Sequence, residues 1–250
     1  MKLIASAVLL LLSFSSIMHA QDEDDYEQPH TSRHRGGIVG AGGGVTPTWY
    51  WIRTSTINTE LAKKSFPALS GDGMFIMGGQ GYAYLPFVPN LRIGGIGAGG
   101  SLESSETRNG IYRSVSLKTN FGGINLEYVF PFGRFHAAIG GVLAAGSQSF
   151  ILEQTADGPK QWDNVLDPIS PGTPDTRHEF SNVFFSWQPA VTAEFDVNPF
   201  IVAGLTGGYY GTSGSKWKVD GNFDLNGLPD LELNGYFLRL TVTVGLFLAE

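Results

Sequence analysis

The sequence predicts an all-β fold: a transmembrane, antiparallel, up-and-down barrel of about eight strands. Three observations predict it, namely apolar segments with period two, connections that alternate between tight and long, and a polar face with few charges. The chain has 250 residues, of which 34 are glycine and only 16% are charged, against ~25% in ordinary soluble domains. Glycine is scattered through every apolar segment, which disfavours helix. We therefore expect no helix after residue 37.

Eight apolar segments are the candidate strands. Because side chains alternate across a strand, Tyr236–Leu248 has one aliphatic face on its even positions and a small, mostly polar face on its odd positions. In the segment 115–130 the apolar positions change phase at Gly122-Gly123, where we expect a β-bulge to keep one face apolar. The eight segments are 37–45, 72–85, 91–100, 111–130, 135–151, 181–197, 199–211 and 235–248.

The connections between these segments are of two kinds that alternate along the chain. The tight ones contain Pro, Gly or Asn and lie at 86–92, 131–135 and 196–200. The long, polar ones lie at 46–70, 152–180 and 212–234, with a shorter one at 101–110. An up-and-down barrel produces this alternation, with tight turns at one rim and long loops at the other.

The composition of the polar face indicates which face of the barrel contacts lipid. A water-exposed surface normally carries many Lys and Glu, but this face holds mainly Gly, Ala, Ser, Thr and Gln, which suit a narrow barrel interior. The aliphatic face is therefore predicted to face lipid, and a soluble lipocalin-like binding barrel is the reverse alternative. Aromatic residues expected at the membrane interfaces are Trp49, Tyr50, Trp51, Phe130, Phe132, Phe135, Trp187 and Phe200.

The N-terminal region and the overall composition limit the location and the partners. Residues 1–20 have the layout of a secretory signal peptide, cut after Ala20, which predicts Sec export. Residues 21–36 change from acidic to basic without apolar periodicity and are predicted to be a disordered tail, leaving 37–250 as the barrel domain. The chain has no cysteine, which excludes disulfides and thiolate metal sites, and its formal charge of −7 disfavours nucleic acid as a partner.

Two stretches, "NVFFSWQPAVTAEFDVNPF" and "GYFLRLTVTVGLFL", carry a family resemblance. With them the chain resembles the small eight-stranded outer-membrane barrels of Gram-negative-type bacteria, such as the OmpA membrane domain and its OmpX- and OmpW-like relatives. The resemblance implies a location in the outer membrane, with outer-membrane lipid and the barrel assembly machinery as partners. The family's final strand typically ends in an aromatic residue, whereas here Phe247 lies three positions before the end.

Charges on the inward face are the first candidate functional residues. Arg92, Glu127, Glu194 and Arg239 fall on inward positions, and His136 is a further candidate beside Glu127 across the turn at 131–135. A charge inside a narrow barrel is costly unless it is paired. The five residues therefore indicate either an ion-pair network that fills the lumen or a polar path for water, ions or small solutes.

The long loops offer two other kinds of chemistry. The loop 212–234 resembles a shortened calcium loop, because it carries the hard oxygen ligands Asp220, Asn222, Asp224, Asn226 and Asp230. The sequence is compatible either with a Ca²⁺-stabilised loop or with a solvated acidic hairpin. His178, Glu179 and Ser181 supply the residue types of a hydrolase without a recognisable motif.

Three functions follow as hypotheses from these features. The first is a non-enzymatic outer-membrane scaffold whose outer loops contact an extracellular ligand or protein. The second is a narrow, porin-like channel for water, ions or small apolar solutes. The third is a lipid-modifying enzyme of the outer membrane.

Overall fold

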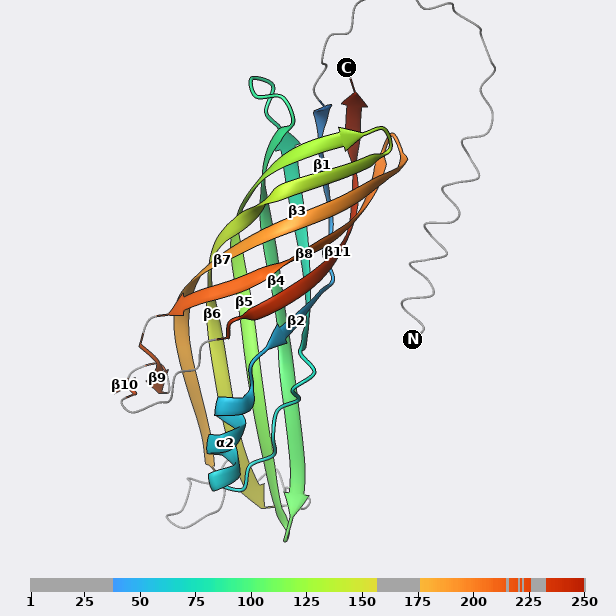
Figure 1. Cartoon of the computed structure of the whole chain (residues 1–250). Coiled ribbons are helices and arrows are strands. Elements are labelled where there is room, and N and C mark those ends of the chain that lie inside the picture. The colour runs from blue at the N-terminus through green and yellow to red at the C-terminus, as the bar shows by residue number, and fades with distance from the viewer. Residues whose placement is uncertain are drawn as a thin grey trace, which may run out of the picture. The chain divides into compact units, whose positions relative to one another are not determined.

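The computed structural model describes residues 38–156, 176–214, 216–219, 221, 223–225 and 233–249, without the side chains of 248 and 249. These residues form one antiparallel sheet and one helix (Figure 1). The elements are β1 (Ile38–Val45), β2 (Thr48–Ile52), α2 (Ser55–Lys63), β3 (Met74–Tyr84), β4 (Leu91–Arg108), β5 (Ile111–Phe132), β6 (Phe135–Ala156), β7 (Thr176–Asn198), β8 (Ile201–Gly214), β9 (Lys218–Val219), β10 (Phe223–Asp224) and β11 (Gly235–Ala249).

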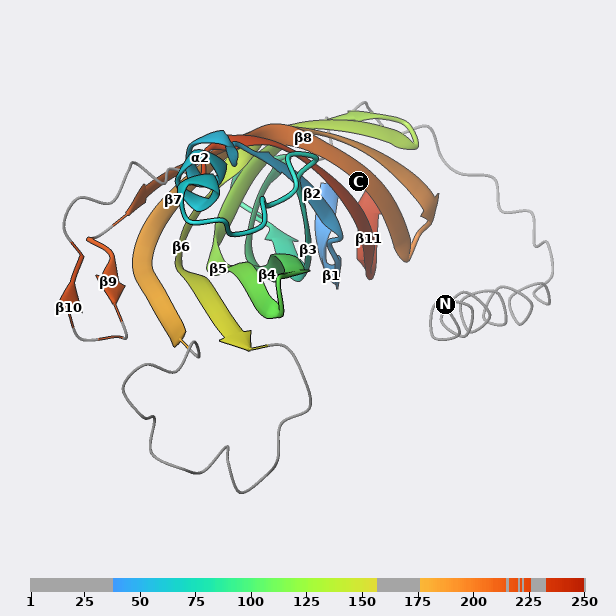
Figure 2. The same cartoon turned by 90° about the horizontal axis from the view of Figure 1, so that it is seen from below.

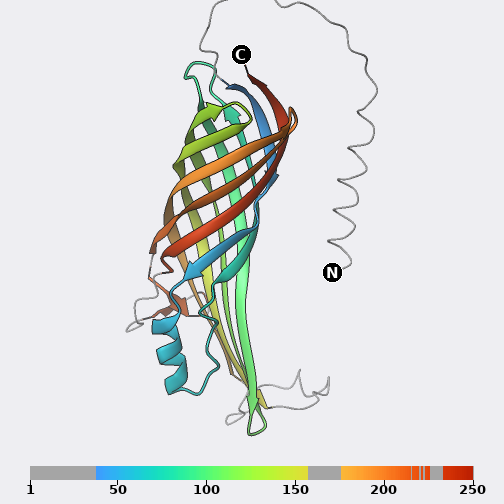
Figure 3. The same cartoon turned by 45° about the vertical axis from the view of Figure 1, so that its right-hand side comes forward.

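The barrel closes as a ring of eight strands, because β1 and β2 together form a single one. Both pair with β3 on one side and with β11 on the other, in the same register throughout. They are separated only at Thr46-Pro47, where proline lacks an N–H for the ladder. Even there Thr46 N donates to the Gly78 carbonyl and Leu240 N donates to the Pro47 carbonyl. The predicted fold class is thus confirmed, and Figure 3 shows the first strand closing against β11.

The tight turns lie together at one end of the barrel, as the alternation of connections predicts. At one end, the turn end, short connections join β3 to β4, β5 to β6 and β7 to β8, and Ile38 pairs with Ala249. At the other end, the loop end, β2 connects to β3 through a segment that contains α2. Two positive backbone angles, φ 63° at Asn90 and φ 69° at Gly133, allow the turn end to be tight.

The aliphatic face of the strands points outward, as the sequence predicts. In β11 the side chain of Tyr236 is 67% exposed and that of Thr241 is 3% exposed. The same alternation holds around the ring, so the outer surface is apolar. Outward-facing apolar side chains include Ile93, Ile124, Leu126, Ile139, Leu143, Val183, Phe185, Val191, Leu205, Leu238, Leu240, Val244 and Leu246. This surface is the arrangement expected of a transmembrane barrel.

The predicted β-bulge at Gly122-Gly123 is wrong. The register of β5 with β4 and with β6 runs without a shift through both glycines. Leu117 and Phe121 therefore point into the lumen, while Ile124 and Leu126 point outward. The apolar positions change phase because the loop half of the lumen is itself filled with apolar side chains.

The connection predicted at 101–110 is instead a strand hairpin. β4 continues to Arg108 and β5 starts at Ile111, joined by Asn109 (φ 53°) and Gly110 (φ 71°), a two-residue turn with positive φ at both positions. The segment has few apolar residues because it extends past the apolar belt. There backbone pairing continues the strands (Figure 1), and the Ser116 hydroxyl donates across the hairpin to Glu103.

The expectation of no helix after residue 37 is also wrong. Ser55–Lys63 forms α2, in which Ile57 and Leu61 are buried at the i, i+4 spacing of one helix face. In the described part of the chain no helix is long and apolar enough to cross a membrane.

Candidate functional site: the lumen and the projecting sheet

An ion-pair network crosses the lumen near the turn end. The Arg92 guanidinium on β4 donates to both Glu194 oxygens on β7 at 2.8 Å and to Glu127 Oε2 on β5 at 3.0 Å. The side chain of Arg92 is only 1% exposed and its guanidinium carbon lies 4.3 Å from the centre of the Tyr82 ring. Because β4 and β7 are separated by two strands around the ring, this network spans the bore.

Hydroxyl groups and glycines complete the surroundings of the network. Thr192 donates to Glu127 Oε1 at 3.3 Å and lies 2.9 Å from the Thr206 hydroxyl. A Cβ on Gly140 would lie 2.8 Å from Glu127 Cγ, and a Cβ on Gly204 would lie 3.2 Å from Glu194 Cγ. Glycine at these two inward positions leaves the space that the carboxylate side chains occupy.

His136 and Arg239, the other two predicted members, lie outside this network. His136 Nε2 lies 2.7 Å from Asp196 Oδ2, so its partner is this aspartate and not Glu127. The alternation along β7 places Asp196 inward two residues after Glu194, next to the paired strand β6. Arg239 donates to Gln188 Oε1 at 3.0 Å, and within the described ranges it forms no ion pair with a carboxylate.

Tyr50 requires a correction, because it faces the lumen and not the membrane interface. Trp49 and Trp51 point outward, so alternation turns Tyr50 inward, where it is 1% exposed. Its hydroxyl lies 3.4 Å from Gln188 Oε1, the oxygen that also accepts from Arg239. Tyr50 and Gln188 thus connect the polar and the apolar parts of the lumen.

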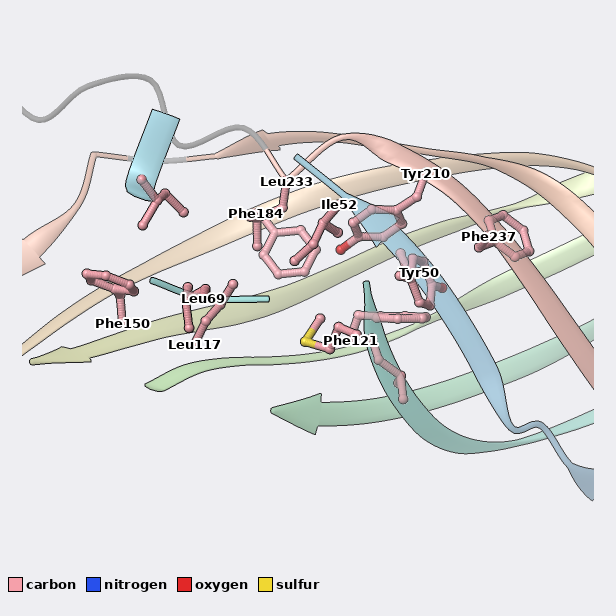
Figure 4. Close-up of a cluster of buried hydrophobic side chains, with 14 of the residues drawn as sticks. Tyr50, Ile52, Leu69, Leu117, Phe121, Phe150, Phe184, Tyr210, Leu233 and Phe237 are labelled. Carbon is pink, nitrogen blue, oxygen red and sulfur yellow. The ribbon is translucent and has the colours of Figure 1, made fainter. Parts of the chain in front are cut away.

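A layer of aromatic rings fills the bore on the loop side of Gln188 (Figure 4). Tyr50 stacks on Phe237 with ring centres 5.5 Å apart and contacts Tyr210 edge-on at 4.9 Å. Tyr210 also lies 6.1 Å from Phe121 and 6.4 Å from Phe184. These five residues come from β2, β11, β8, β5 and β7, so side chains from most of the ring meet at one level.

The loop side of this aromatic layer continues as an ordinary hydrophobic core. Ile57 and Leu61 of α2, together with Leu69, are buried in one cluster with Leu117 of β5 and Phe184 of β7. The helix and its connection thereby cover the inner, apolar face of the strands at the loop end (Figure 2). Sequence alternation could not reveal this, because it marks inward positions without showing that some are filled by a distant loop.

The aromatic residues predicted at the interfaces, apart from Tyr50, are exposed on the outer face. Phe130, Phe132, Phe135 and Phe200 lie at or next to the turn end. On the loop side Trp187 lies 5.5 Å from Tyr209, and Tyr209 lies 5.6 Å from Tyr236, which pairs with Trp51. This aromatic row across β7, β8, β11 and β2 includes Tyr209, which is not among the aromatic residues that the sequence predicts at the interfaces.

Beyond the apolar belt, β4, β5, β6 and β7 continue as a sheet that we call the projecting sheet. Its outward side chains are mostly polar, including Ser101, Lys118, Ser149 and Ser181, which are opposite one another in the register. Ser149 donates to Glu179 at 2.7 Å. Figures 1 and 3 show these strands extending past the rest of the barrel.

His178 and Ser181, two of the candidate hydrolase residues, do not come together on this sheet. His178 pairs with Leu152, whose side chain packs against the core, whereas Ser181 pairs with Ser149 on the outer face. Alternation places the His178 and Ser181 side chains on opposite faces of β7, so the serine has no access to this histidine as a base.

The calcium hypothesis for the loop 212–234 stays a prediction. Asp220, Asn222, Asn226 and Asp230 lie outside the described residues, and Asp224 is exposed on the short strand β10. Within the described segments no group of three or more His, Asp or Glu side chains is placed to hold a metal ion.

Comparisons with known proteins identify no family. The sequence matches no protein-family model and no curated protein sequence. Among solved structures it is similar to Ail, the attachment invasion locus protein of Yersinia pestis, at 11% identity and a TM-score of 0.37, covering 85% of this chain and 99% of Ail. It is also similar to the outer membrane protease OmpT from Escherichia coli, at 10% identity and a TM-score of 0.36, covering 86% of this chain and 96% of OmpT.

A third similar structure is a major outer membrane protein from Thermus thermophilus, at 9% identity and a TM-score of 0.39, covering 84% of this chain and 99% of that one. At such scores these similarities carry no argument, either about the fold or about function. The class of the protein follows from its own geometry: a closed, eight-stranded, transmembrane β-barrel with an apolar exterior and side chains packed across its lumen.

Proposed function

We propose that this chain is an integral outer-membrane protein of a Gram-negative-type bacterium that acts as a non-enzymatic scaffold. Its barrel anchors the projecting sheet, and the sheet contacts the surroundings of the cell. The observation that carries the proposal is the contrast between a lumen packed at several levels and a polar sheet face that no other described element covers.

The membrane location is supported by the exterior. A belt of outward aliphatic side chains around the ring, with aromatic rings at both of its edges, would be costly in water. A closed barrel also leaves no unpaired strand edge in lipid. We infer that the turn end faces the periplasm and the loop end faces outward, as in barrels with short periplasmic turns.

The scaffold is favoured over the channel by the lumen. Arg92 and its two carboxylates cross the bore near the turn end, and the five-ring aromatic layer with α2 behind it fills the loop half. A solute would have to displace both. Against an enzyme, the serine and histidine weighed above lie on opposite faces of β7.

Planar-bilayer recording of the folded protein tests this proposal. We expect no stepwise conductance after insertion, because two packed layers close the path. Electrophoresis of unheated and heated samples in SDS serves as the control, since a mobility shift identifies folded barrels. If protein that shows this mobility shift gave reproducible unit conductance, the result would support the channel instead.

A further inference from the structure

The outer face of the projecting sheet carries a groove of about 300 Å³ that the proposed function does not explain. Strands β4, β5, β6 and β7 all contribute to it. Its polar lining includes Glu103, Tyr112, Ser116, Lys118, Glu153 and Arg177. Ile151 also lines the groove and is nearly fully buried although it points outward, so it forms part of the floor.

The strand register places this groove on the lipid side of the molecule. Lys118 and Ile124 are both even positions of β5, and no register shift separates them, so their side chains share the outer face. Ile124 lies in the apolar belt, and six residues at ~3.3 Å each put Lys118 about 20 Å further along the strand. The groove therefore lies on the same face as the apolar belt and beyond its loop-side edge, which is where the proposed orientation puts the head groups of the outer leaflet.

The opposite face of the same strands is already occupied. Leu117 and Phe150 point inward into the cluster that Ile57, Leu61 and Leu69 complete. At the level of Leu117 and Phe150, α2 and its connection cover that face, so the outer face is the one left there for a ligand.

The chemistry of the groove suits a polyhydroxyl compound. Lys118 and Arg177 supply donors, while Glu103 and Glu153 supply acceptors, so the four charges cancel. Ser116 donates to Glu103 at 3.3 Å, and Tyr112 adds an aromatic side chain. Sugar hydroxyls both donate and accept, and they match this mixture better than a bare phosphate or a cation would.

We propose that this groove binds the sugar head group of a glycolipid in the outer leaflet. The inference rests on the proposed outer-membrane location. A glycolipid in the same leaflet is confined to the plane of the groove, which raises its effective concentration there without requiring a tight intrinsic contact.

The test compares two double variants of the full chain in nanodiscs made with or without lipopolysaccharide. Lys118→Ala/Glu153→Gln removes one base and one acid from the groove. The control, Arg108→Ala/Glu106→Gln, also removes one base and one acid, but from an exposed ion pair on the other face of the β4–β5 hairpin. The readout is the amount of lipopolysaccharide that stays bound through detergent extraction and purification.

We expect the wild type and the Arg108/Glu106 variant to retain lipopolysaccharide, and the Lys118/Glu153 variant to retain about tenfold less, as the loss of charged hydrogen bonds implies. Equal retention by the two variants would overturn the proposal. So would binding of the delipidated oligosaccharide at the same affinity with no retention of the intact lipid, because the source would then be a soluble glycan. A missing heat-dependent mobility shift would instead count against the proposed barrel itself.

Discussion

At the scale of single residues, Arg92 decides whether the charged interior is stable. Its guanidinium satisfies Glu194 with two hydrogen bonds and Glu127 with a third, in a site almost without solvent. Bidentate, charge-assisted pairs of this geometry are the strongest hydrogen bonds of proteins. They offset a desolvation cost that each partner alone would leave uncompensated.

Replacing Arg92 with Met should lower the free energy of unfolding by about 3–5 kcal/mol, because two carboxylates stay buried without a counter-charge. Urea unfolding in detergent micelles, followed by tryptophan emission, measures the change. Arg92→Met/Glu127→Gln/Glu194→Gln should recover most of the loss. Lys63→Ala, which breaks the exposed pair with Glu60, should change the free energy of unfolding by less than about 1 kcal/mol. A single Arg92→Met variant as stable as wild type would refute the network's role.

At the scale of elements, the two faces of β11 face different solvents. Leu240 points outward opposite Leu205, while Arg239 and Thr241 on either side point into the lumen. Leu240→Arg should therefore destabilise the barrel in lipid vesicles by about 2–4 kcal/mol, the cost of Arg near the bilayer centre. Thr107→Arg, on the exposed tip of β4, should change stability by less than about 0.5 kcal/mol. Equal effects of both substitutions would mean that the outer face is not in lipid.

The β4–β5 hairpin depends on the backbone of its turn. Gly110 has φ 71°, which costs other residues about 1–2 kcal/mol. Gly110→Ala should loosen the tip and speed tryptic cleavage after Arg108, whereas Asn109→Gly should leave cleavage unchanged because glycine adopts positive φ freely. Cleavage rates that are the same for both variants would show that the turn does not control the hairpin.

The elements also show how far the sequence could predict this molecule. β7 and β11 were readable because one face is in lipid and the other lines a polar lumen. The sequence does not predict α2, because Ile57 and Leu61 are its two buried residues and the segment around them is polar. The hairpin at 101–110 was missed because strands past the bilayer lose their apolar pattern.

The interior shows the same limit for the candidate site. Alternation predicts that Arg92, Glu127, Glu194 and Arg239 point inward, and the structure has them inward. It could not show that His136 contacts Asp196, since that contact joins residues 60 positions apart. Alternation also could not distinguish the polar half of the lumen near the turn end from the aromatic half near the loop end, because the side chains of both halves are at inward positions.

At the scale of the whole molecule, the protein is a packed barrel whose outer surface is apolar along the belt and mostly polar beyond it. Its lumen holds an ion-pair network, a polar connection through Gln188 and an aromatic layer, in that order from the turn end. Strands that contribute Arg92, Phe121 and Phe184 to the lumen also extend past the belt in the projecting sheet. The part of the protein that lies in the membrane and the projecting sheet outside it therefore share continuous strands.

The most direct test of this account is quenching of Trp187 by lipids with brominated acyl chains. The variant keeps Trp187 and replaces the other four tryptophans by Phe; Trp187 lies on the outer face beside the apolar belt. A matched variant replaces Trp187 as well and introduces Tyr210→Trp inside the lumen. The account predicts strong quenching of Trp187 and little quenching of the tryptophan at position 210. Quenching confined to the inner position, or a soluble protein with neither quenched, would contradict it.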